Sequence, residues 1–279
     1  MKKIKRKRIS LGTMAMIVIL AVSLLPFAIM LLGSIKPNMA LSLIPVDFSP
    51  FHNTTLNNFK QVFETANVGR AYLNSVYLTA FVVACEVFLS VTAGYVFATK
   101  EFPLKGLLFG LVIVTMMMPR QLLLVPNFMV AKKLSLIDNL TGVGLTTINA
   151  SYGIFLTRQY ILTIPKDFYE SARIDGCSEL KIFTYIVLPL IKPVMAAVAI
   201  STMFTVWNDY LWQNIMLTSP EYQTMPLMLA YISNKVQNGM PAVGLQLAGS
   251  VVAVTPLLIF FMIFQRWFIE GISAGGIKE

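Results

Sequence analysis

The stretch between residues 165 and 193 reads PKDFYESARIDGCSELKIFTYIVLPLIKP and separates two apolar segments. It holds seven of the chain's 22 basic and 13 acidic residues within 16 positions. Charges at this density are excluded from hydrocarbon, because a membrane core offers them neither water nor enough partners. The stretch therefore faces water, and it interrupts the apolar pattern that continues on both sides of it.

The same stretch predicts two short helices set at an angle. Pro165 suits a first helical position, and no helix breaker follows until Gly176 supplies a bend. Ser178 fits the N-cap of a second helix. Apolar residues of that helix recur at helical spacing, at Leu180, Phe183, Val187 and Leu190. The pattern fits a surface element that docks on a partner, and it fits equally a structured loop that only links two membrane helices.

The composition is that of a polytopic membrane protein. Of the 279 residues, 56% are hydrophobic and 13% are charged, and the mean hydropathy is +0.71; a soluble domain has about 25% charged residues. The net charge of +9 does not indicate a nucleic-acid partner. Six of the 22 basic residues lie in the first eight positions and most others flank apolar segments, which is typical of membrane topology.

Six apolar segments predict an all-α integral membrane protein with six transmembrane helices, at about residues 11–33, 76–98, 107–125, 140–162, 194–217 and 246–264. The first segment follows basic residues as a signal peptide does, but it is about 20 residues long and no small-residue cleavage site ends it, so we expect an uncleaved helix. Prolines predict kinks at Pro26, Pro119 and Pro256. A short surface helix is expected near residues 57–63.

The basic residues also predict the orientation in the membrane. Six spans place both ends of the chain on the same side. If the N-terminus is cytoplasmic, 15 of the 22 basic residues lie in inner segments and seven in outer ones, as the positive-inside rule requires. We therefore expect both termini and the helix-turn-helix of residues 165–193 in the cytoplasm.

The sequence offers no catalytic chemistry. There is no glycine-rich phosphate loop ending in Lys-Ser or Lys-Thr, so the chain is not expected to hydrolyse ATP. No metal-ligand spacing and no set of nucleophile, base and orienting group is found. Cys85 lies in an apolar run and Cys177 in the charged stretch, so no disulfide between them is expected. We predict no catalytic residue, no bound metal and no cofactor in this chain.

Polar residues within the spans are candidates for a translocation path, and they are Asn149, Asn208 and Asp209. An acid inside a helix that crosses a membrane is costly and needs compensation. For Asp209, which lies in the run WNDYLW, the alternative is an aromatic belt made by Trp207, Tyr210 and Trp212 at the membrane interface. For Asn149, the alternative is an interhelical hydrogen bond.

The water-facing stretch resembles the EAA motif of ABC importer permeases, whose wider form is EAARIDGA…F…I.LPL..P. Ser171 and Cys177 replace alanines of that form with other small residues. The run Trp207–Trp212 resembles the WN[DE][FY]LWP stretch of MalG-like permeases of maltose-type carbohydrate importers, with Gln213 in place of the proline. The ending of residues 265–278 is similar to that family's tail QRYFVEGLTAGAVKG. The resemblance covers essentially the whole chain.

This resemblance implies that the two short helices couple the chain to a separate ATPase. The residues implied in coupling are Glu170, Ser171, Ala172, Asp175, Gly176, Leu188 and Pro189, and a second ATPase contact is implied at Gly271, Gly275 and Gly276. The implied partners are a larger MalF-like permease, two copies of an ATPase that binds ATP and Mg, and an extracellular solute-binding protein that meets the loops at 34–70 and 218–245.

The resemblance also implies a division of the chain and a location. Residues 1–68 would form the tail, first helix and extracellular segment, residues 69–265 a type-1 permease domain, and residues 266–279 a cytoplasmic tail. The location would be the bacterial cytoplasmic membrane, and the cargo a carbohydrate, with an oligosaccharide favoured. A permease for a glycerol-phosphate-like solute is an alternative within the family.

Two other functions remain open from the residues alone. An ion-driven secondary transporter would need paired ionisable groups near the midplane and often an internal repeat, and this chain offers chiefly Glu86 and Asp209. A membrane scaffold or receptor would leave the helix-turn-helix without a role. Copurification with an ATPase would separate the three possibilities.

Overall fold

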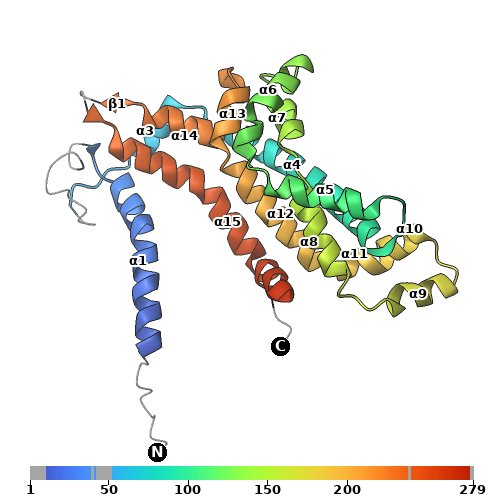
Figure 1. Cartoon of the computed structure of the whole chain (residues 1–279). Coiled ribbons are helices and arrows are strands. Elements are labelled where there is room, and N and C mark those ends of the chain that lie inside the picture. The colour runs from blue at the N-terminus through green and yellow to red at the C-terminus, as the bar shows by residue number, and fades with distance from the viewer. Residues whose placement is uncertain (1–10, 39–40, 42–51, 238–239, 277–279) are drawn as a thin grey trace, which may run out of the picture. The chain divides into compact units, whose positions relative to one another are not determined.

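The computed structural model describes residues 11–38, 41, 52–237 and 240–276. Within them the chain is helical apart from a short antiparallel pair of strands, β1 (Val236–Gln237) and β2 (Met240–Pro241) (Figure 1). The chain divides into two compact units. One unit contains residues 1–68 and 228–255, and the other contains residues 69–227 and 256–279. The all-helical class predicted from the sequence is confirmed.

In the first unit, a side chain of α3 forms hydrogen bonds with backbone carbonyls at the end of α1. It contains α1 (Leu11–Ser34), α3 (Asn57–Thr65), most of α14 (Met225–Ser233) and the start of α15 (Val243–Gly276). The amide of Asn58 donates to the carbonyls of Ser34 and Lys36, at 2.8 and 2.7 Å. Gly244 lies so close to Asn58 and to the Lys36 backbone that no Cβ would fit. The short helix expected near residues 57–63 is confirmed as α3.

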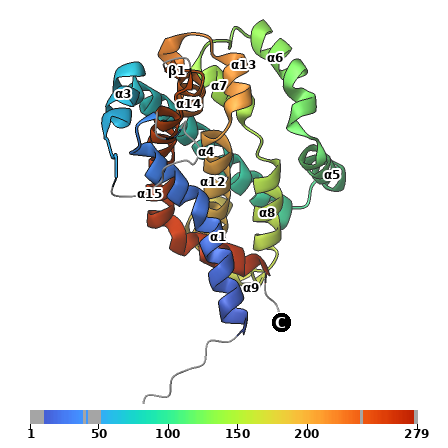
Figure 2. The same cartoon turned by 90° about the vertical axis from the view of Figure 1, so that its left-hand side faces the viewer.

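The second unit carries the remaining elements, which are α4 (Val68–Thr99), α5 (Lys105–Met117), η1 (Arg120–Leu123), α6 (Leu124–Lys133), α7 (Leu140–Thr147), α8 (Ser151–Ile161), α9 (Asp167–Ile174), α10 (Glu179–Lys181), η2 (Ile182–Val187), α11 (Leu188–Leu190), α12 (Lys192–Trp207), α13 (Tyr210–Met216) and η3 (Pro220–Tyr222). Helix α8 contacts both α5 and α12 (Figures 1 and 2).

Glycines let α4 and α8 approach closely. A Cβ at Gly153 would lie 2.0 Å from Ser90 Oγ, and one at Gly94 would lie 2.7 Å from Thr157 Cβ. Close approach of small residues is a usual way for helices to pack in a membrane, where burial of apolar surface gives little driving force. The two glycines therefore make the close crossing of α4 and α8 possible.

Three described helices are long and apolar enough to cross a membrane, at Gly12–Ser34, Val68–Thr99 and Val243–Ile263. Two further pairs of helices satisfy the same test only when taken together, and each pair is bent: Lys105–Met117 with Arg120–Lys133 by 98°, and Glu179–Leu190 with Lys192–Trp207 by 73°. By length and composition, the described residues thus supply three to five spans, and the count of six stays a prediction.

Several expected spans are interrupted. The predicted third span, 107–125, is broken at Pro119, where a kink was expected; Pro119 has extended backbone and separates α5 from η1 and α6. The predicted fourth span, 140–162, is divided into α7 and α8. The predicted fifth span, 194–217, is divided at Asn208–Asp209. Pro26 and Pro256, in contrast, lie inside α1 and α15. Hydropathy predicts these apolar stretches but not the breaks within them.

The apolar face expected on the second short helix is confirmed only in part. Val187 is buried and Phe183 packs against the core, but Leu180 and Leu190 are exposed. Ile182 and Ile191 are buried in their place. Residues 182–187 form a π-helix, which adds a residue to the turn and rotates the following side chains. The buried residues join one core cluster, made of Val91, Tyr95, Ile161, Tyr169, Ala172, Ile182, Val187, Ile191 and Val194.

Candidate functional site

The helix-turn-helix at residues 165–193 is built around the turn at Gly176. Its φ of +78° is in the left-handed region, which glycine adopts without a Cβ penalty. The Gly176 N–H donates to the Arg173 carbonyl and the Cys177 N–H to the Ala172 carbonyl, each at 3.0 Å. This pair of bonds is a Schellman motif, and it ends α9. The bend predicted at Gly176 is confirmed.

The residues singled out from the sequence divide between two sides of this element. Glu170, Ser171, Asp175, Gly176 and Pro189 are exposed. Leu188 is half-buried and Ala172 is buried in the core cluster beneath the element. The small side chain at Ala172 therefore serves packing within this chain, and only the exposed residues are available to a partner.

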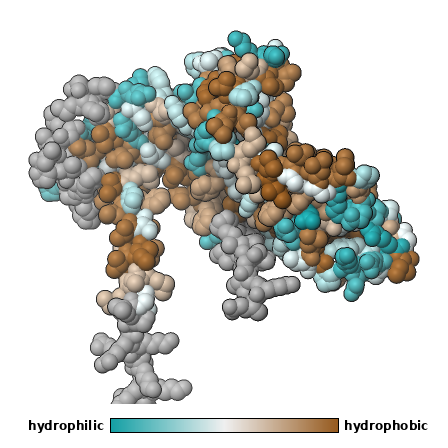
Figure 3. All heavy atoms as spheres, in the orientation of Figure 1, coloured by the Kyte–Doolittle hydropathy of each residue, from teal (hydrophilic) through white to brown (hydrophobic). Residues whose placement is uncertain are grey.

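Exposed apolar side chains accompany those charges, a feature that sequence reasoning missed. Phe168, Ile174, Leu180 and Tyr185 are all more than half exposed. Figure 3 shows mainly hydrophilic residues over the end of the second unit that carries α9 and α10, with apolar residues among them. Large apolar side chains among charges are typical of a protein interface.

Glu179 ties this element to α4. Its Oε2 accepts from Lys100 Nζ at 2.5 Å and from the Tyr95 hydroxyl at 2.9 Å. Its Oε1 accepts from Arg173 Nε at 3.0 Å. The hydrogen bond from Lys100, followed by those from Tyr95 and Arg173, outweighs the opposing effect of burial and lowers the pKa of Glu179 to about 2. One carboxylate thus links α9, α10 and the end of α4.

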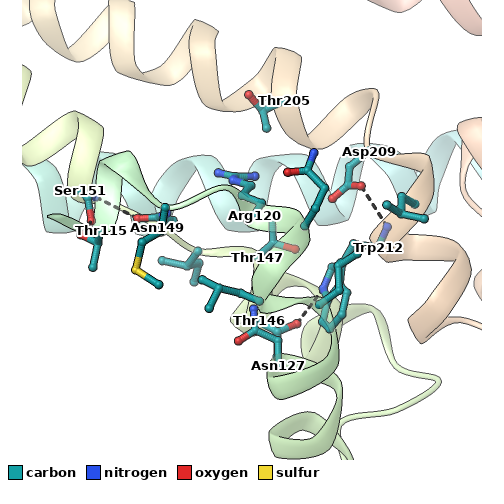
Figure 4. Close-up of a pocket in the computed structure, with 16 residues that line it drawn as sticks. Thr115, Arg120, Asn127, Thr146, Thr147, Asn149, Ser151, Thr205, Asp209 and Trp212 are labelled. Carbon is teal, nitrogen blue, oxygen red and sulfur yellow. Dashed lines mark hydrogen bonds between the residues drawn. The ribbon is translucent and has the colours of Figure 1, made fainter. Parts of the chain in front are cut away.

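The second unit also contains a cavity of about 500 Å³ (Figure 4). Its wall is formed by residues of α5, η1, α6, α7, α8, α12 and α13 and of the break between α7 and α8. The polar side chains of the wall are those of Thr115, Arg120, Gln121, Asn127, Thr146, Thr147, Asn149, Ser151, Thr205 and Asp209. Hydroxyls and amides therefore outnumber charged groups on this wall.

Asp209 and Trp212 hold one end of this cavity wall. Asp209 Oδ1 accepts from the Trp212 backbone N–H at 3.1 Å, which makes Asp209 the N-cap of α13. The Trp212 indole N–H donates to Thr146 Oγ1 at 3.1 Å (Figure 4). Trp207 and Trp212 are both buried, so these two rings do not form the aromatic belt that was the alternative reading of this run.

The structure brings Asn149 and Asp209 to the same cavity but leaves Asn208 out of its wall. The Asn208 amide donates to the Phe204 carbonyl at 2.8 Å instead. Asn149 lies in the break between α7 and α8, where its Oδ1 accepts from the Ser151 N–H at 3.3 Å. Its backbone N–H donates to Glu86 at 2.8 Å, so the interhelical hydrogen bond expected at Asn149 is made by the main chain.

Three polar residues of this region were not picked out from the sequence as site residues. Arg120 lines the cavity and a neighbouring cavity of about 260 Å³. Glu86 is buried and also lines the smaller cavity. Gln213, which stands where the family has proline, is buried; its amide donates to the Val206 carbonyl at 2.9 Å and accepts from the Thr224 hydroxyl. Each of these three residues is a polar residue within or at the end of an apolar segment, and this is the sequence feature that could have identified it.

The predicted tail contact lies at the end of α15. That helix continues through Gly271, Gly275 and Gly276, so the backbone of the expected tail is helical to this point. Residues 277–279, which include Lys278, lie outside the described part of the chain. Among the described residues, no three His, Cys, Asp or Glu side chains come close enough together to hold a metal ion.

Residues 90–274 match the model of the family described as "Binding-protein-dependent transport system inner membrane component". The chain belongs to this family. It is therefore an integral membrane subunit of a transport system, as the hydropathy and the helix-turn-helix predicted. A transport role also agrees with the prediction that the chain is not an enzyme.

Characterised relatives cover nearly the whole chain. The arabinooligosaccharide permease AraQ of Halalkalibacterium halodurans is 35% identical over 260 residues, which are 92% of each chain. The melibiose/raffinose/stachyose permease MelC of Bacillus subtilis is 30% identical over the full length of both chains. The sn-glycerol-3-phosphate permease UgpE of Yersinia pestis is 32% identical over 206 residues, 73% of this chain and 72% of UgpE. The predicted resemblance to sugar ABC permeases is confirmed.

A solved structure shares the fold. A chain of a bacterial ABC transporter involved in import of the acidic polysaccharide alginate aligns with a TM-score of 0.81. The alignment covers 96% of this chain and 100% of that one, at 20% sequence identity. The helix arrangement of the two chains is thus the same type, whereas so low an identity says nothing about cargo.

Proposed function

We propose that this chain is a permease subunit of an ATP-driven, binding-protein-dependent importer of carbohydrate, with an oligosaccharide as cargo. The observation that carries the proposal is the presence, in one compact unit, of a hydroxyl- and amide-lined cavity and an exposed helix-turn-helix with a charged and apolar surface. The first would form part of a path for a neutral polyhydroxylated solute, and the second would receive motion from an ATPase. The oligosaccharide cargoes named for AraQ and MelC support this choice.

The cavity suits a sugar because it offers many weak, neutral partners. Hydroxyl and amide groups both donate and accept hydrogen bonds, so they can replace the water around sugar hydroxyls. A path needs contacts that are good enough to admit a solute and weak enough to release it. Asn149 and Asp209 are proposed to take part because they line the cavity, whereas Asn208 lies outside its wall.

The remaining subunits are proposed from the family to which the chain belongs. A larger MalF-like permease would complete the path, and a homodimer of an ATPase would bind ATP and Mg and receive the exposed residues of 165–193. The helical end of α15, at Gly271, Gly275 and Gly276, is proposed as a second contact with the ATPase. A solute-binding protein would deliver the cargo from outside, and both termini would be cytoplasmic in a bacterial cytoplasmic membrane.

A second cargo is favoured by one residue. Arg120 lies at the centre of the side chains drawn in Figure 4 and lines both cavities. A guanidinium binds phosphate and carboxylate oxygens through paired N–H groups. A glycerol-phosphate-like or uronate-containing solute is therefore the second candidate, and UgpE, named for sn-glycerol 3-phosphate, is a relative of this chain.

The experiment that tests the proposal is ATPase activity of the assembled complex, with and without the binding protein and solute. Arabinotriose, raffinose and glycerol 3-phosphate are the three probes. We expect a sugar with binding protein to stimulate hydrolysis, and Glu170→Arg to abolish the stimulation because it reverses the charge on the exposed face of α9. Glu101→Arg reverses an exposed acid outside this element and is the matched control.

Each outcome decides between the alternatives. Stimulation by glycerol 3-phosphate alone would replace sugar with the phosphate ester as cargo. Stimulation that survives Glu170→Arg would show that the 165–193 element does not couple the chain to the ATPase. A complex without any ATPase would favour the ion-driven transporter instead.

A further inference from the structure

Glu86 is a buried carboxyl group in the middle of the apolar helix α4. Only 7% of its surface is exposed, and both of its oxygens accept hydrogen bonds. Oε1 accepts from the backbone N–H of Asn149 at 2.8 Å, and Oε2 accepts from the hydroxyl of Thr202 at 2.5 Å. These partners lie 63 and 116 residues away along the chain. A carboxyl group is costly to bury in a membrane, and the two hydrogen bonds offset part of that cost.

The contact with Asn149 satisfies a helix break. Helix α7 ends at Thr147 and α8 begins at Ser151. The Ile148 N–H still donates to the Gly144 carbonyl, but the Asn149 N–H lies beyond this end of α7 and bonds to Glu86 instead. An unpaired N–H inside a membrane protein is costly, because no water is there to replace the lost bond. At the start of a helix, a free backbone N–H normally donates to the side chain of a residue just before it, which is called the N-cap. Here the acceptor comes from another helix.

The break lies where the two cavities meet. Asn149 lines the larger cavity and the smaller one, and Glu86 and Thr202 line the smaller one. Glu86 therefore connects three parts of the wall: α4, the α7–α8 break and α12. If the break moved, Asn149 and Ser151 would change their position in the larger cavity.

We propose that Glu86 is a positioning residue that holds the α7–α8 break in place and ties it to α12, and so sets the shape of the cavity wall. The role rests on the proposed function only in treating the cavity as a path for solute. It does not depend on which solute is carried. The carboxyl group acts through the Asn149 backbone and does not itself contact the solute.

The test is the reactivity of a single cysteine placed in the break. Ala150 is half-buried and lies next to Asn149, so Ala150→Cys in a chain with Cys85→Ser and Cys177→Ser reports the exposure of this segment. The full complex is kept in membrane vesicles, and the rate of labelling by a small maleimide is measured. No solute and no ATP hydrolysis are needed, so the result is independent of the proposed cargo.

We expect Glu86→Ala to raise the labelling rate about fivefold to tenfold, the shift in an opening equilibrium that follows when the Asn149 N–H loses its buried acceptor. Glu86→Gln keeps an acceptor for Asn149 and should restore the rate to near that of the parent. Ser90→Ala is the matched control: Ser90 is buried one turn further along α4 and its hydroxyl has no hydrogen-bond partner, so the rate should not change.

If the complex with Glu86→Ala does not assemble, two less disruptive substitutions at Thr202 provide the same test. Thr202→Val removes one hydrogen bond at nearly constant volume, and Thr202→Ser keeps it. Thr202→Val should raise the labelling rate about twofold to fivefold and Thr202→Ser should leave it unchanged. Equal rates in Glu86→Ala and the parent, or in Thr202→Val and Thr202→Ser, would overturn the proposal. So would an equal increase in Ser90→Ala, which would indicate general loosening of α4.

Discussion

Glu179 is the residue at which the water-facing element meets α4. Three donors, from Lys100, Tyr95 and Arg173, converge on its carboxylate. None of these partners is adjacent to Glu179 in the sequence, and Tyr95 lies 84 residues away. A surface ion pair usually contributes little, because water competes for both charges. A carboxylate with three donors is more constraining than a simple pair, so it can hold the two short helices in one orientation.

Glu179→Gln is expected to loosen residues 165–193, because it removes the charge that three donors share. Hydrogen exchange of peptides from this stretch, followed by mass spectrometry at pH 7, should be faster in the variant. The matched substitution Glu101→Gln changes an exposed acid that forms an ion pair with Lys105 and should leave the exchange of 165–193 unchanged. Equal protection in Glu179→Gln and the parent would mean that the contact does not hold the element.

The pKa of Glu179 gives the same element a defined dependence on pH. The hydrogen bond from Lys100, with those from Tyr95 and Arg173, lowers the pKa of Glu179 from 4.5 to about 2. The native state therefore favours the ionised form of this carboxyl group. The stabilisation is fully present above about pH 4.5 and is lost as the pH falls towards about 2. After correction for intrinsic exchange, protection of residues 165–193 should decrease between pH 5 and pH 3 in the parent. Glu179→Gln should show a smaller decrease over that range.

Gly176 is required at the turn for a conformational reason alone. A Cβ added there would meet no atom within 4 Å, but its φ of +78° is unfavourable for any residue with a side chain. Gly176→Ala should therefore cost about 1 kcal/mol and lower the thermal midpoint of the purified complex. Gly106→Ala, also without neighbours within 4 Å but in the first turn of α5, should be neutral or slightly stabilising. Equal midpoints in the two variants would contradict this account.

At the scale of elements, breaks in the helices create the cavity. Pro119 separates α5 from η1, residues 148–150 separate α7 from α8, and Asn208–Asp209 separate α12 from α13. Irregular backbone at membrane depth is tolerated only where protein or a water-filled cavity surrounds it. All three breaks contribute residues to the wall of the larger cavity or lie directly beside it.

The close crossing of α4 and α8 lies near the start of α8, next to the α7–α8 break, and a substitution at Gly153 tests it. In Gly153→Ala the new Cβ would lie 2.0 Å from Ser90 Oγ and 2.7 Å from Ser90 Cβ. The hydroxyl can rotate, but the Cβ cannot move without α4, so we expect a loss of about 1–3 kcal/mol. The thermal midpoint and the yield of assembled complex should both decrease.

Gly110→Ala is the control for that substitution. It introduces the same methyl group within helix α5, where no atom lies within 4 Å, and should gain rather than lose helix stability. If Gly153→Ala behaved in the same way, α4 and α8 would not be in close contact at this crossing.

At the scale of the whole molecule, the distribution of charge predicts the topology, and the two native cysteines can test it. Cys177 is exposed in the 165–193 element, and Cys85 is half-buried within the apolar helix α4. A membrane-impermeant maleimide should label Cys177 in inverted vesicles but not in intact cells, and it should not label Cys85 in either. Cys177→Ser removes the signal and is the control. Labelling of Cys177 from outside would reverse the orientation.

The features that could be predicted from the sequence alone are those that depend on residues close together in the chain. The excess of apolar residues makes this a helical membrane protein, and the charge density of 165–193 places that stretch in water. The Gly176 turn follows from one residue's backbone freedom. These inferences hold because hydropathy, charge density and backbone preference act within a few residues, and the family motif is read over the same short range.

What only the tertiary structure decided depends on residues far apart in the chain. Pro119 predicted a kink within 107–125, but no local pattern indicated where 140–162 and 194–217 would break. Ile182 and Ile191, which the helical spacing did not predict, are buried around the π-helix at 182–187. The partners of Glu86 cannot be read from its neighbours, and neither can Tyr95 and Lys100, the two distant partners of Glu179, because segments separated by tens of residues supply them. Helix packing decides whether a buried polar side chain holds two helices together, lines a cavity or bonds to its own backbone. No local sequence pattern encodes that packing.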